Sequence, residues 1–237
     1  MGLVHARSEL VKALEAEADP ERAEGQQRYF KNRMRFLGLR LGDARRIVDQ
    51  HPEAWEGKDC KEVLDLAESL MADRVFEHQV AAVHLVQKVK RSLQMEDLPR
   101  FERWLQCHVD NWAEADEVAN HILDHFILHD RSVTEATFAW AGSENIWLRR
   151  AAAVCLVVPM RKQDHLQDVL RVSKALLKDP EDLVQKGYGW ALKECSKKHP
   201  EEVYAFIMEN RGQMPRTPLR IALEKYDPEK RRAAMSR

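Results

Sequence analysis

The sequence lacks an apolar run long enough to cross a membrane, and its first residues lack the apolar core and cleavage site of a signal peptide. Its four cysteines, Cys60, Cys107, Cys155 and Cys195, are scattered and form no C-x-x-C pair, which argues against a disulfide framework or a redox motif. The phosphate loops G-x-x-x-x-G-K-[ST] and G-x-G-x-x-G and the nucleophile elbow G-x-S-x-G are also absent. These absences predict a cytoplasmic protein with reduced cysteines and no membrane partner.

Charge is nearly balanced over the 237 residues, with a formal net charge of −1, so the whole chain shows no polyanion-binding excess. Its distribution is uneven, however. From Asn145 to the end there are 19 Lys and Arg against 12 Asp and Glu, and the preceding part has 19 against 27. A basic second half suits a polyanion partner, although charges scattered over solvated helix faces explain the same counts.

Helical periodicity dominates the sequence, strand patterns are nearly absent, and Gly and Pro stand mostly between the periodic segments. Asn111 is a suitable N-cap, and Glu114 at the third helical position completes a pattern resembling a capping box. No linker interrupts the chain, so we predict one all-α domain over residues 1–237. The helices are expected near residues 4–17, 20–35, 42–50, 59–71, 75–91, 97–107, 112–128, 132–141, 146–160, 164–177, 181–198, 200–209 and 215–225.

A degenerate repeat accompanies these helices. The segments EHQVAAVHLV (77–86), WLRRAAAVCL (147–156) and LVQKGYGWAL (183–192) each have small residues at a helix centre, and their offsets give a period of 35–36 residues. Small residues fit positions where helices of adjacent repeats pack closely. The pattern predicts stacked helical hairpins of the HEAT type.

This register places four residues from successive repeats on one predicted surface. When Trp112 and Asp116 are shifted forward by one repeat and Trp190 is shifted back, they fall with Arg150 at positions i, i+3, i+4 and i+7 of a helix. Each residue also has a structural interpretation: an acid favouring the helix dipole, two packing aromatics and an arginine reaching solvent. The shared stripe favours a functional surface over these separate explanations.

At these residues the sequence resembles the AlkD-type DNA alkylation repair glycosylases. The resemblance rests on QRYFKNRMRFLG (27–38), NWAEAD (111–116), NIWLRRAAAV (145–154) and QKGYGWALKE (185–194), and more loosely on MPRTPLRIALEKY (214–226). It implies a right-handed superhelix of HEAT-like repeats with a basic concave face that binds DNA. It also implies hydrolytic release of purines alkylated at N3 or N7 as the first step of base excision repair, without a metal or an organic cofactor.

The resemblance assigns roles to individual residues. Asp116 matches the catalytic aspartate, Trp112 and Trp190 match the aromatics that flank the sugar of the lesion, and Arg150 matches a phosphate-contacting arginine. Tyr29 matches an aromatic near the site. The resembled family acts without a base pocket, so little base flipping is expected.

The expected chemistry suits a single carboxylate. A purine alkylated at N3 or N7 is already cationic and leaves without strong protonation, so the barrier lies in the oxocarbenium-like sugar that Asp116 would stabilise. Each tryptophan face against this cation would contribute roughly 0.5–2 kcal/mol. Asn111 and Ala113 stand where the resembled pattern more often has Trp and Asp, a departure that bears on lesion preference.

Further basic residues suit phosphate contacts, namely Lys186, Lys193, Arg216 and Arg220. The expected partner is double-stranded DNA containing alkylated bases, bound by a monomer. His121, His125 and His129 are spaced i, i+4 and i+8 and are interpreted as a polar outward stripe in preference to a metal site. The basic tail PEKRRAAMSR is expected to be disordered, with phosphate contact as the minor alternative.

Two other functions remain open at this point. A HEAT-repeat protein of this kind that binds DNA structures without catalysis would keep the fold and lack base release. A protein-interaction scaffold would bind DNA weakly, with a shallow dependence on salt, whereas a DNA-binding enzyme predicts a steep one.

Overall fold

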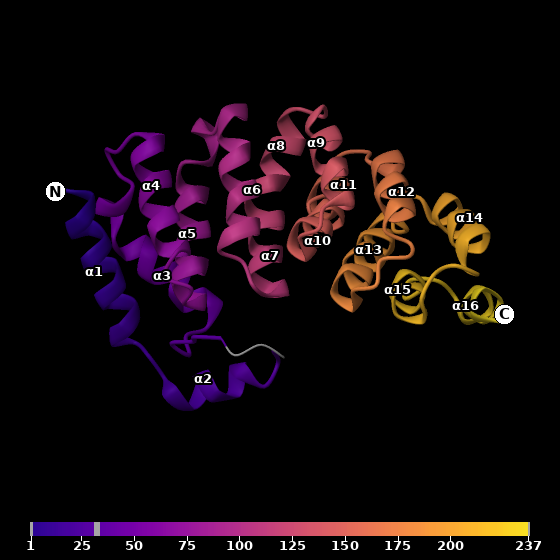
Figure 1. Ribbon diagram of the computed structural model, residues 1–237, viewed down its shortest axis with the longest axis horizontal. Helices are drawn as coiled ribbons and strands as arrows, with labels where there is room; N and C mark the ends of the chain where they lie inside the picture. Colours follow the sequence, from indigo (N-terminus) through magenta and orange to yellow (C-terminus); the bar gives the residue numbers. More distant parts are fainter. Residues whose placement is uncertain (1, 31–33, 237) are drawn as a thin grey trace. The chain divides into compact units, whose positions relative to one another are not determined.

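The computed structural model describes residues 2–30 and 34–236, and every regular element in these ranges is helical (Figure 1). The predicted all-α fold is therefore confirmed. The helices form two compact units, Met1–Ile122 and Leu123–Arg237, which are described separately below. The prediction of one domain over residues 1–237 stays a prediction. None of the described helices is both long enough and apolar enough to span a membrane.

In the first unit, α5 occupies the centre: it packs against α3, α4 and α7, and most of its residues are buried. Helix α2 is set apart from the other helices of this unit (Figure 1). The helices of the unit are α1 (Leu3–Ala16), α2 (Pro20–Gln27), α3 (Leu41–Gln50), α4 (Cys60–Met71), α5 (Phe76–Lys88), α6 (Leu98–Cys107) and α7 (Trp112–Val118).

In the second unit, α10 packs against α13, and α13 packs against both α12 and α15. A Cβ on Gly189 would lie 2.9 Å from the Cα of Pro218, so glycine permits the close approach of α13 and α15. The helices of the unit are α8 (Asp124–His129), α9 (Val133–Ala139), α10 (Ile146–Val154), α11 (Val157–Lys162), α12 (Leu166–Ala175), α13 (Asp182–Cys195), α14 (Pro200–Asn210), α15 (Arg216–Ala222) and α16 (Pro228–Met235).

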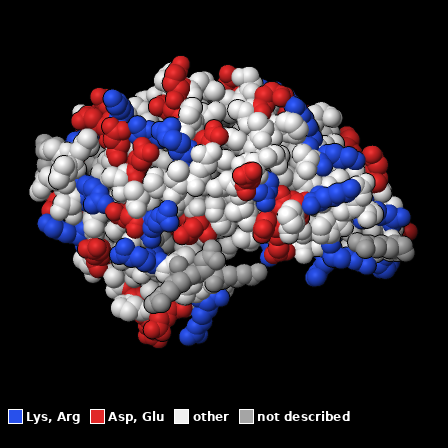
Figure 2. Space-filling view, in the orientation of Figure 1, with Lys and Arg blue, Asp and Glu red and all other residues white. Residues whose placement is uncertain are grey.

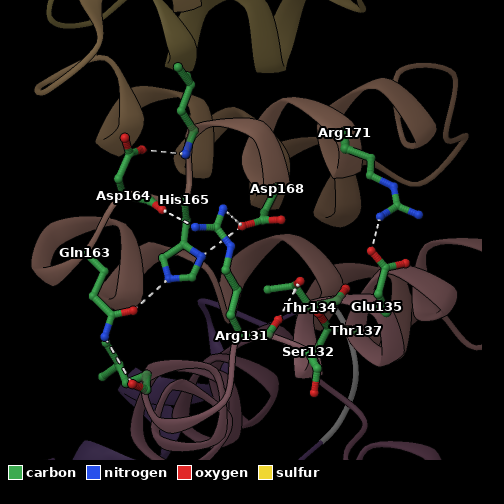
Figure 3. A network of polar contacts seen from close by, with 12 residues as sticks. Arg131, Ser132, Thr134, Glu135, Thr137, Gln163, Asp164, His165, Asp168 and Arg171 are labelled. Carbon is green, nitrogen blue, oxygen red and sulfur yellow. Dashed lines mark hydrogen bonds and ion pairs between the residues drawn. The ribbon is translucent and has the colours of Figure 1, made fainter.

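Polar contacts between successive repeats recur at about the predicted period. Arg100 contacts Asp65 at 2.8 Å across 35 residues, and Arg161 contacts Glu194 at 2.9 Å across 33 residues. Figure 3 shows a denser set in the second unit. There the buried His165 contacts Asp168 through Nδ1 at 2.9 Å, and Arg131 donates to the same carboxylate at 3.0 Å across 37 residues. Charged side chains thus join equivalent positions of neighbouring repeats.

A side-chain cap begins α7. Asn111 accepts hydrogen bonds from the backbone N–H groups of Ala113 and Glu114, so the predicted N-cap of α7 is confirmed. The reciprocal bond differs from a capping box, because the Glu114 carboxylate accepts from the N–H of Asp110 at 3.2 Å and not from that of Asn111.

Several predicted helices end earlier than expected. The helix predicted over 20–35 ends at Gln27, and α2 buries no residue that would favour its continuation; residues 31–33 of this prediction lie outside the described residues. The helix predicted over 112–128 is interrupted by a π-helical turn over Ala119–Leu123. The one predicted over 146–160 breaks between α10 and α11.

The prediction of a disordered tail is wrong for residues 228–235, which form α16. Asp227 caps the start by accepting from the backbone N–H groups of Glu229 and Lys230. At the other end, Arg211 donates to the carbonyl groups of Ala233 and Ser236. Cationic side chains are favourable at helix C-termini, and this tertiary contact was not evident from the polar composition of the tail.

The segment after α2 is fastened to α5 by the carboxylate of Glu77, which has no exposed area. It accepts hydrogen bonds from the backbone N–H groups of Leu37, Gly38 and Leu39 at 2.8, 2.9 and 3.1 Å. Gly38 has a φ of +89°, and a Cβ there would lie 2.0 Å from the carbonyl oxygen of Asp19. Glycine is therefore required at this turn.

We predict that Gly38→Ala lowers the free energy of unfolding by at least about 2 kcal/mol, because the new Cβ clashes with backbone at a left-handed φ. Gly42→Ala is the matched control, since a Cβ at that helical position meets nothing within 4 Å. It is expected to raise stability by about 0.5 kcal/mol. Urea denaturation measures both variants, and equal effects would contradict the role of the Gly38 turn.

Candidate functional site

Asp116 and Trp112 line one pocket of about 320 Å³ in the first unit. Both side chains come from α7 and reach the same pocket. The predicted stripe that also includes Arg150 and Trp190 stays a prediction. Asp116 is half-buried, and the side chain of Asn120 donates to its backbone carbonyl at 3.1 Å. The other walls of the pocket are formed by residues of α2 and the segment after it, together with Leu41 and Phe76.

Four aromatic rings form the apolar part of this pocket. Phe30 stacks on Trp112 with ring centroids 5.6 Å apart and an interplanar angle of 15°. Phe36 lies 5.5 Å from Phe30 and 5.3 Å from Phe76, in tilted arrangements. Trp112 keeps 38% of its surface exposed. The aromatic cluster therefore presents flat apolar surfaces beside a carboxylate.

Tyr29 also lines the pocket and is 81% exposed, so its ring is accessible at the edge of the aromatic cluster. The backbone N–H of Tyr29 donates to the carbonyl of Gln26 in the turn that ends α2. The structure thus brings Tyr29 to the same pocket as Trp112 and Asp116.

A second carboxylate of α7, that of Glu117, lines the pocket next to Asp116. Arg45 of α3 holds it with one guanidinium nitrogen, 2.8 and 2.9 Å from its two oxygens, and His121 lies 3.8 Å away. The Glu117 side chain is only 13% exposed. Its charge is therefore balanced by a fixed cation of the neighbouring helix.

In the second unit, Arg150 is buried and joins α10 to α13. The residue is only 5% exposed, and its Nη1 donates to the carbonyl of Leu183. Gly187 packs over the arginine, since a Cβ there would lie 3.4 Å from the Cγ of Arg150. This contact gives Arg150 a structural role, and its phosphate contact stays a prediction.

Trp190 is half-buried on α13, with Lys186 and Lys193 one turn before and after it. Lys186 contacts Asp182 at 2.6 Å, and Lys193 contacts Glu224 at 2.9 Å. Both lysines thus have acidic partners in the structure. The role of Trp190 beside a sugar stays a prediction.

The two predicted arginines of α15 differ in their surroundings. Arg216 donates to the carbonyl of Met235 at 2.9 Å and so contacts the end of α16. Arg220 is exposed and lines a notch between α15 and α16. Among the described residues, none forms an ion pair with Arg220.

Comparisons with known proteins identify the family of the chain. The family model of the DNA alkylation repair enzymes matches residues 10–226. The chain belongs to this family. A solved structure described as a predicted DNA alkylation repair enzyme from Enterococcus faecalis superposes with a TM-score of 0.80, with 18% identity, covering 89% of this chain and 97% of that chain. No curated protein matches the sequence.

Membership of the family gives the chain a role in the repair of alkylated DNA and makes DNA its partner. The structural likeness supports the predicted HEAT-like helical repeat fold. The right-handed twist and the concave face remain predictions.

Sequence reasoning missed several residues of the pocket of this alkylation repair family member. Phe30 and Phe36 lie in the segment QRYFKNRMRFLG, of which only Tyr29 was singled out. Arg45 and Glu117 are 72 residues apart, and no sequence pattern linked them. The sequence feature that indicates Phe30 and Phe36 as site residues is the aromatic content of the segment after α2.

The histidine stripe is only partly as predicted. His129 is exposed, but His125 is buried, and the two rings lie 4.0 Å apart. The π-helical turn Ala119–Leu123 breaks the spacing between His121 and His125. Within the described residues no group of three potential ligands is arranged to hold a metal ion.

Burial controls the charge of Glu114 in the first turn of α7. It raises the pKa of this carboxyl to about 8, and the nearby Asp110 carboxylate acts in the same direction. Hydrogen bonds from Asp110 and Asn111 oppose the shift without cancelling it. At neutral pH Glu114 is therefore mainly protonated.

The raised pKa predicts a stability that falls with rising pH. The folded state binds the Glu114 proton more tightly than the unfolded state, whose pKa is near the ordinary value of 4.5. The stabilisation is therefore complete below that value and is lost as pH rises through about 8, by about 1 kcal/mol per pH unit within the window.

Glu114→Gln should remove this part of the pH dependence and be more stable than the wild type at pH near 8. Urea denaturation at several pH values measures the free energy of unfolding of both proteins and its slope against pH. Glu96→Gln, at an exposed position, is the control and should leave the slope unchanged. A slope that persists in the Glu114 variant would contradict the assignment.

Proposed function

We propose that this protein is a DNA glycosylase that hydrolyses the N-glycosidic bond of cationic, N3- or N7-alkylated purines in duplex DNA, the first step of base excision repair. The proposal narrows the family role to one reaction. The observation that carries it is the carboxylate of Asp116 beside the aromatic rings of Trp112 and Phe30.

The charges around Asp116 suit this reaction. As the glycosidic bond lengthens, positive charge develops on the sugar, and a fixed carboxylate in partly apolar surroundings stabilises that charge more than water does. The neighbouring Glu117 is committed to Arg45. We assign to Asp116 both the stabilisation of the cation and the orientation of the attacking water, because it lines the pocket beside the aromatic rings.

The aromatic rings supply the second part of the proposal. A cation over a tryptophan or tyrosine face gains roughly 0.5–2 kcal/mol, depending on desolvation. Phe30 covers one face of Trp112, and 38% of the tryptophan surface stays exposed. We assign Trp112 and Trp190 to the cationic sugar and lesion, and Tyr29 to the edge of the same site.

Basic side chains of the second unit would bind the DNA backbone. We assign phosphate contacts to Lys186 and Arg220, which are exposed, and to Arg150 and Arg216 after exchange of their carbonyl partners. Lys193 stays paired with Glu224 in this assignment. Such contacts fix the register of the duplex and carry no sequence information. The proposed mechanism uses no metal or organic cofactor and one protein molecule per lesion.

Binding of DNA without catalysis is a second candidate function. It is favoured by two observations: Phe30 covers one face of Trp112, and the guanidinium of Arg150 is engaged by the protein backbone. A base-release assay separates the two candidates, because both predict binding and only the first predicts free base.

We predict that Asp116→Asn lowers the rate of 7-methylguanine release from methylated duplex DNA at least about 100-fold, because the neutral amide stabilises a sugar cation far less. The loss should be in the single-turnover rate, with duplex affinity nearly unchanged. Chromatography of the released base measures the rate, and fluorescence anisotropy measures affinity.

Glu96→Gln is again a control, since this exposed side chain loses its charge away from the pocket. It should excise at the wild-type rate. Equal excision by the Asp116 variant and the wild type would refute the proposed role, whereas a wild type that binds DNA and releases no base would favour the second candidate.

A further inference from the structure

Helix α16 lies beyond the part of the chain that matches the family. The match ends at residue 226, and α16 begins at Pro228. The helix carries Lys230, Arg231 and Arg232 on consecutive positions. Its role is therefore a property of this chain that the family match does not supply.

The helix is docked by specific contacts with α14 and α15. Arg211 donates to the carbonyl of Ser236 at 2.9 Å, and Tyr204 donates to the carbonyl of Lys230 at 3.1 Å. Arg216 donates a hydrogen bond to the backbone carbonyl of Met235, and Ala234 is buried. These contacts fix the orientation of the side chains that α16 presents.

A notch of about 300 Å³ lies between α15 and α16. Its lining comprises Thr217, Arg220, Ile221, Glu224 and Arg231. Figure 2 shows Lys and Arg side chains gathered along the lower right edge, where Figure 1 places these two helices.

The charges of the notch favour an anion. Glu224 brings a negative charge, but Lys193 contacts it at 2.9 Å and balances it. Arg220 and Arg231 are both exposed, and no described residue forms an ion pair with either. Lys230, by contrast, contacts Glu201 at 2.7 Å, and Arg232 is not part of the lining.

We propose that Arg220 and Arg231 together bind one phosphate of the DNA backbone, with the hydroxyl of Thr217 as a further donor. Two guanidinium groups and a hydroxyl supply several N–H and O–H donors, which match the oxygens of a phosphate. Because DNA is the partner of the family, the phosphate of a duplex is the anion of this chemistry that the protein meets. Helix α16 thereby extends the DNA-binding surface past the family-matched chain.

The experiment measures affinity for an undamaged duplex by fluorescence anisotropy between about 50 and about 200 mM salt. Each phosphate contact contributes about 0.9 to the slope of log K against log salt concentration. Arg220→Gln and Arg231→Gln are each expected to weaken binding about three- to tenfold at about 100 mM salt. The double variant should reduce the slope by about 0.9 in total, the value for one shared phosphate.

Arg232→Gln is the matched control, because it removes the same charge from the next position of the same helix. It should weaken binding much less than Arg231→Gln, and circular dichroism should show unchanged helix content in all four variants. Equal losses for Arg231 and Arg232 would overturn the proposal in favour of diffuse attraction. If the double variant reduced the slope of log K against log salt concentration by about 1.8, the two arginines would contact two separate phosphates, and the proposal of one shared phosphate would be overturned.

Binding that none of the variants weakens would assign the notch to another anion, such as an acidic peptide, and would also overturn the proposal. The test is independent of catalysis, because it uses undamaged DNA. Absence of base release with these binding effects intact would refute the proposed glycosylase and leave the phosphate contact standing.

Discussion

The pocket beside Asp116 depends on one buried interaction. The Glu77 carboxylate accepts hydrogen bonds from the backbone N–H groups of Leu37, Gly38 and Leu39. A buried carboxylate is tolerated only when its oxygens are hydrogen-bonded, and here the backbone N–H groups satisfy them. These hydrogen bonds join α5 to the segment after Phe30, which carries Phe36. They therefore hold the aromatic wall against Trp112, although Phe30 and Trp112 are far apart in sequence.

The features that the sequence predicted are those with a local or periodic cause. Helix type, the repeat of about 35 residues and the cap at Asn111 follow from side-chain patterns within one or two turns or one repeat. The end of α2, the Arg45–Glu117 pair and the docking of α16 depend on contacts between distant segments. Periodicity carries no information on such contacts. Of the residues that line the candidate pocket, motifs indicate Trp112, Asp116 and Tyr29, whereas Phe30 and Glu117 required the structure.

The basic composition of the second half overstates the charge available to DNA. Many of its cations hold neighbouring repeats together, as Arg161 does with Glu194 and Arg149 with Asp179. Arg150 serves the same purpose through a backbone carbonyl. Such pairs position the helices and leave fewer groups for phosphates. Exposed arginines without ion-pair partners in the described chain, such as Arg220, are therefore more informative than the net charge.

The proposed reaction is the hydrolysis of an activated glycosidic bond by a protein that supplies a carboxylate and aromatic faces. The most direct test is incubation of the wild-type protein with duplex DNA that carries 7-methylguanine and 3-methyladenine, followed by quantification of free bases and abasic sites. A glycosylase that needs no metal should release both bases and leave matching abasic sites, in metal-chelating buffer as well as without chelator. Tight binding of the duplex with no release above the uncatalysed rate would contradict the proposed reaction.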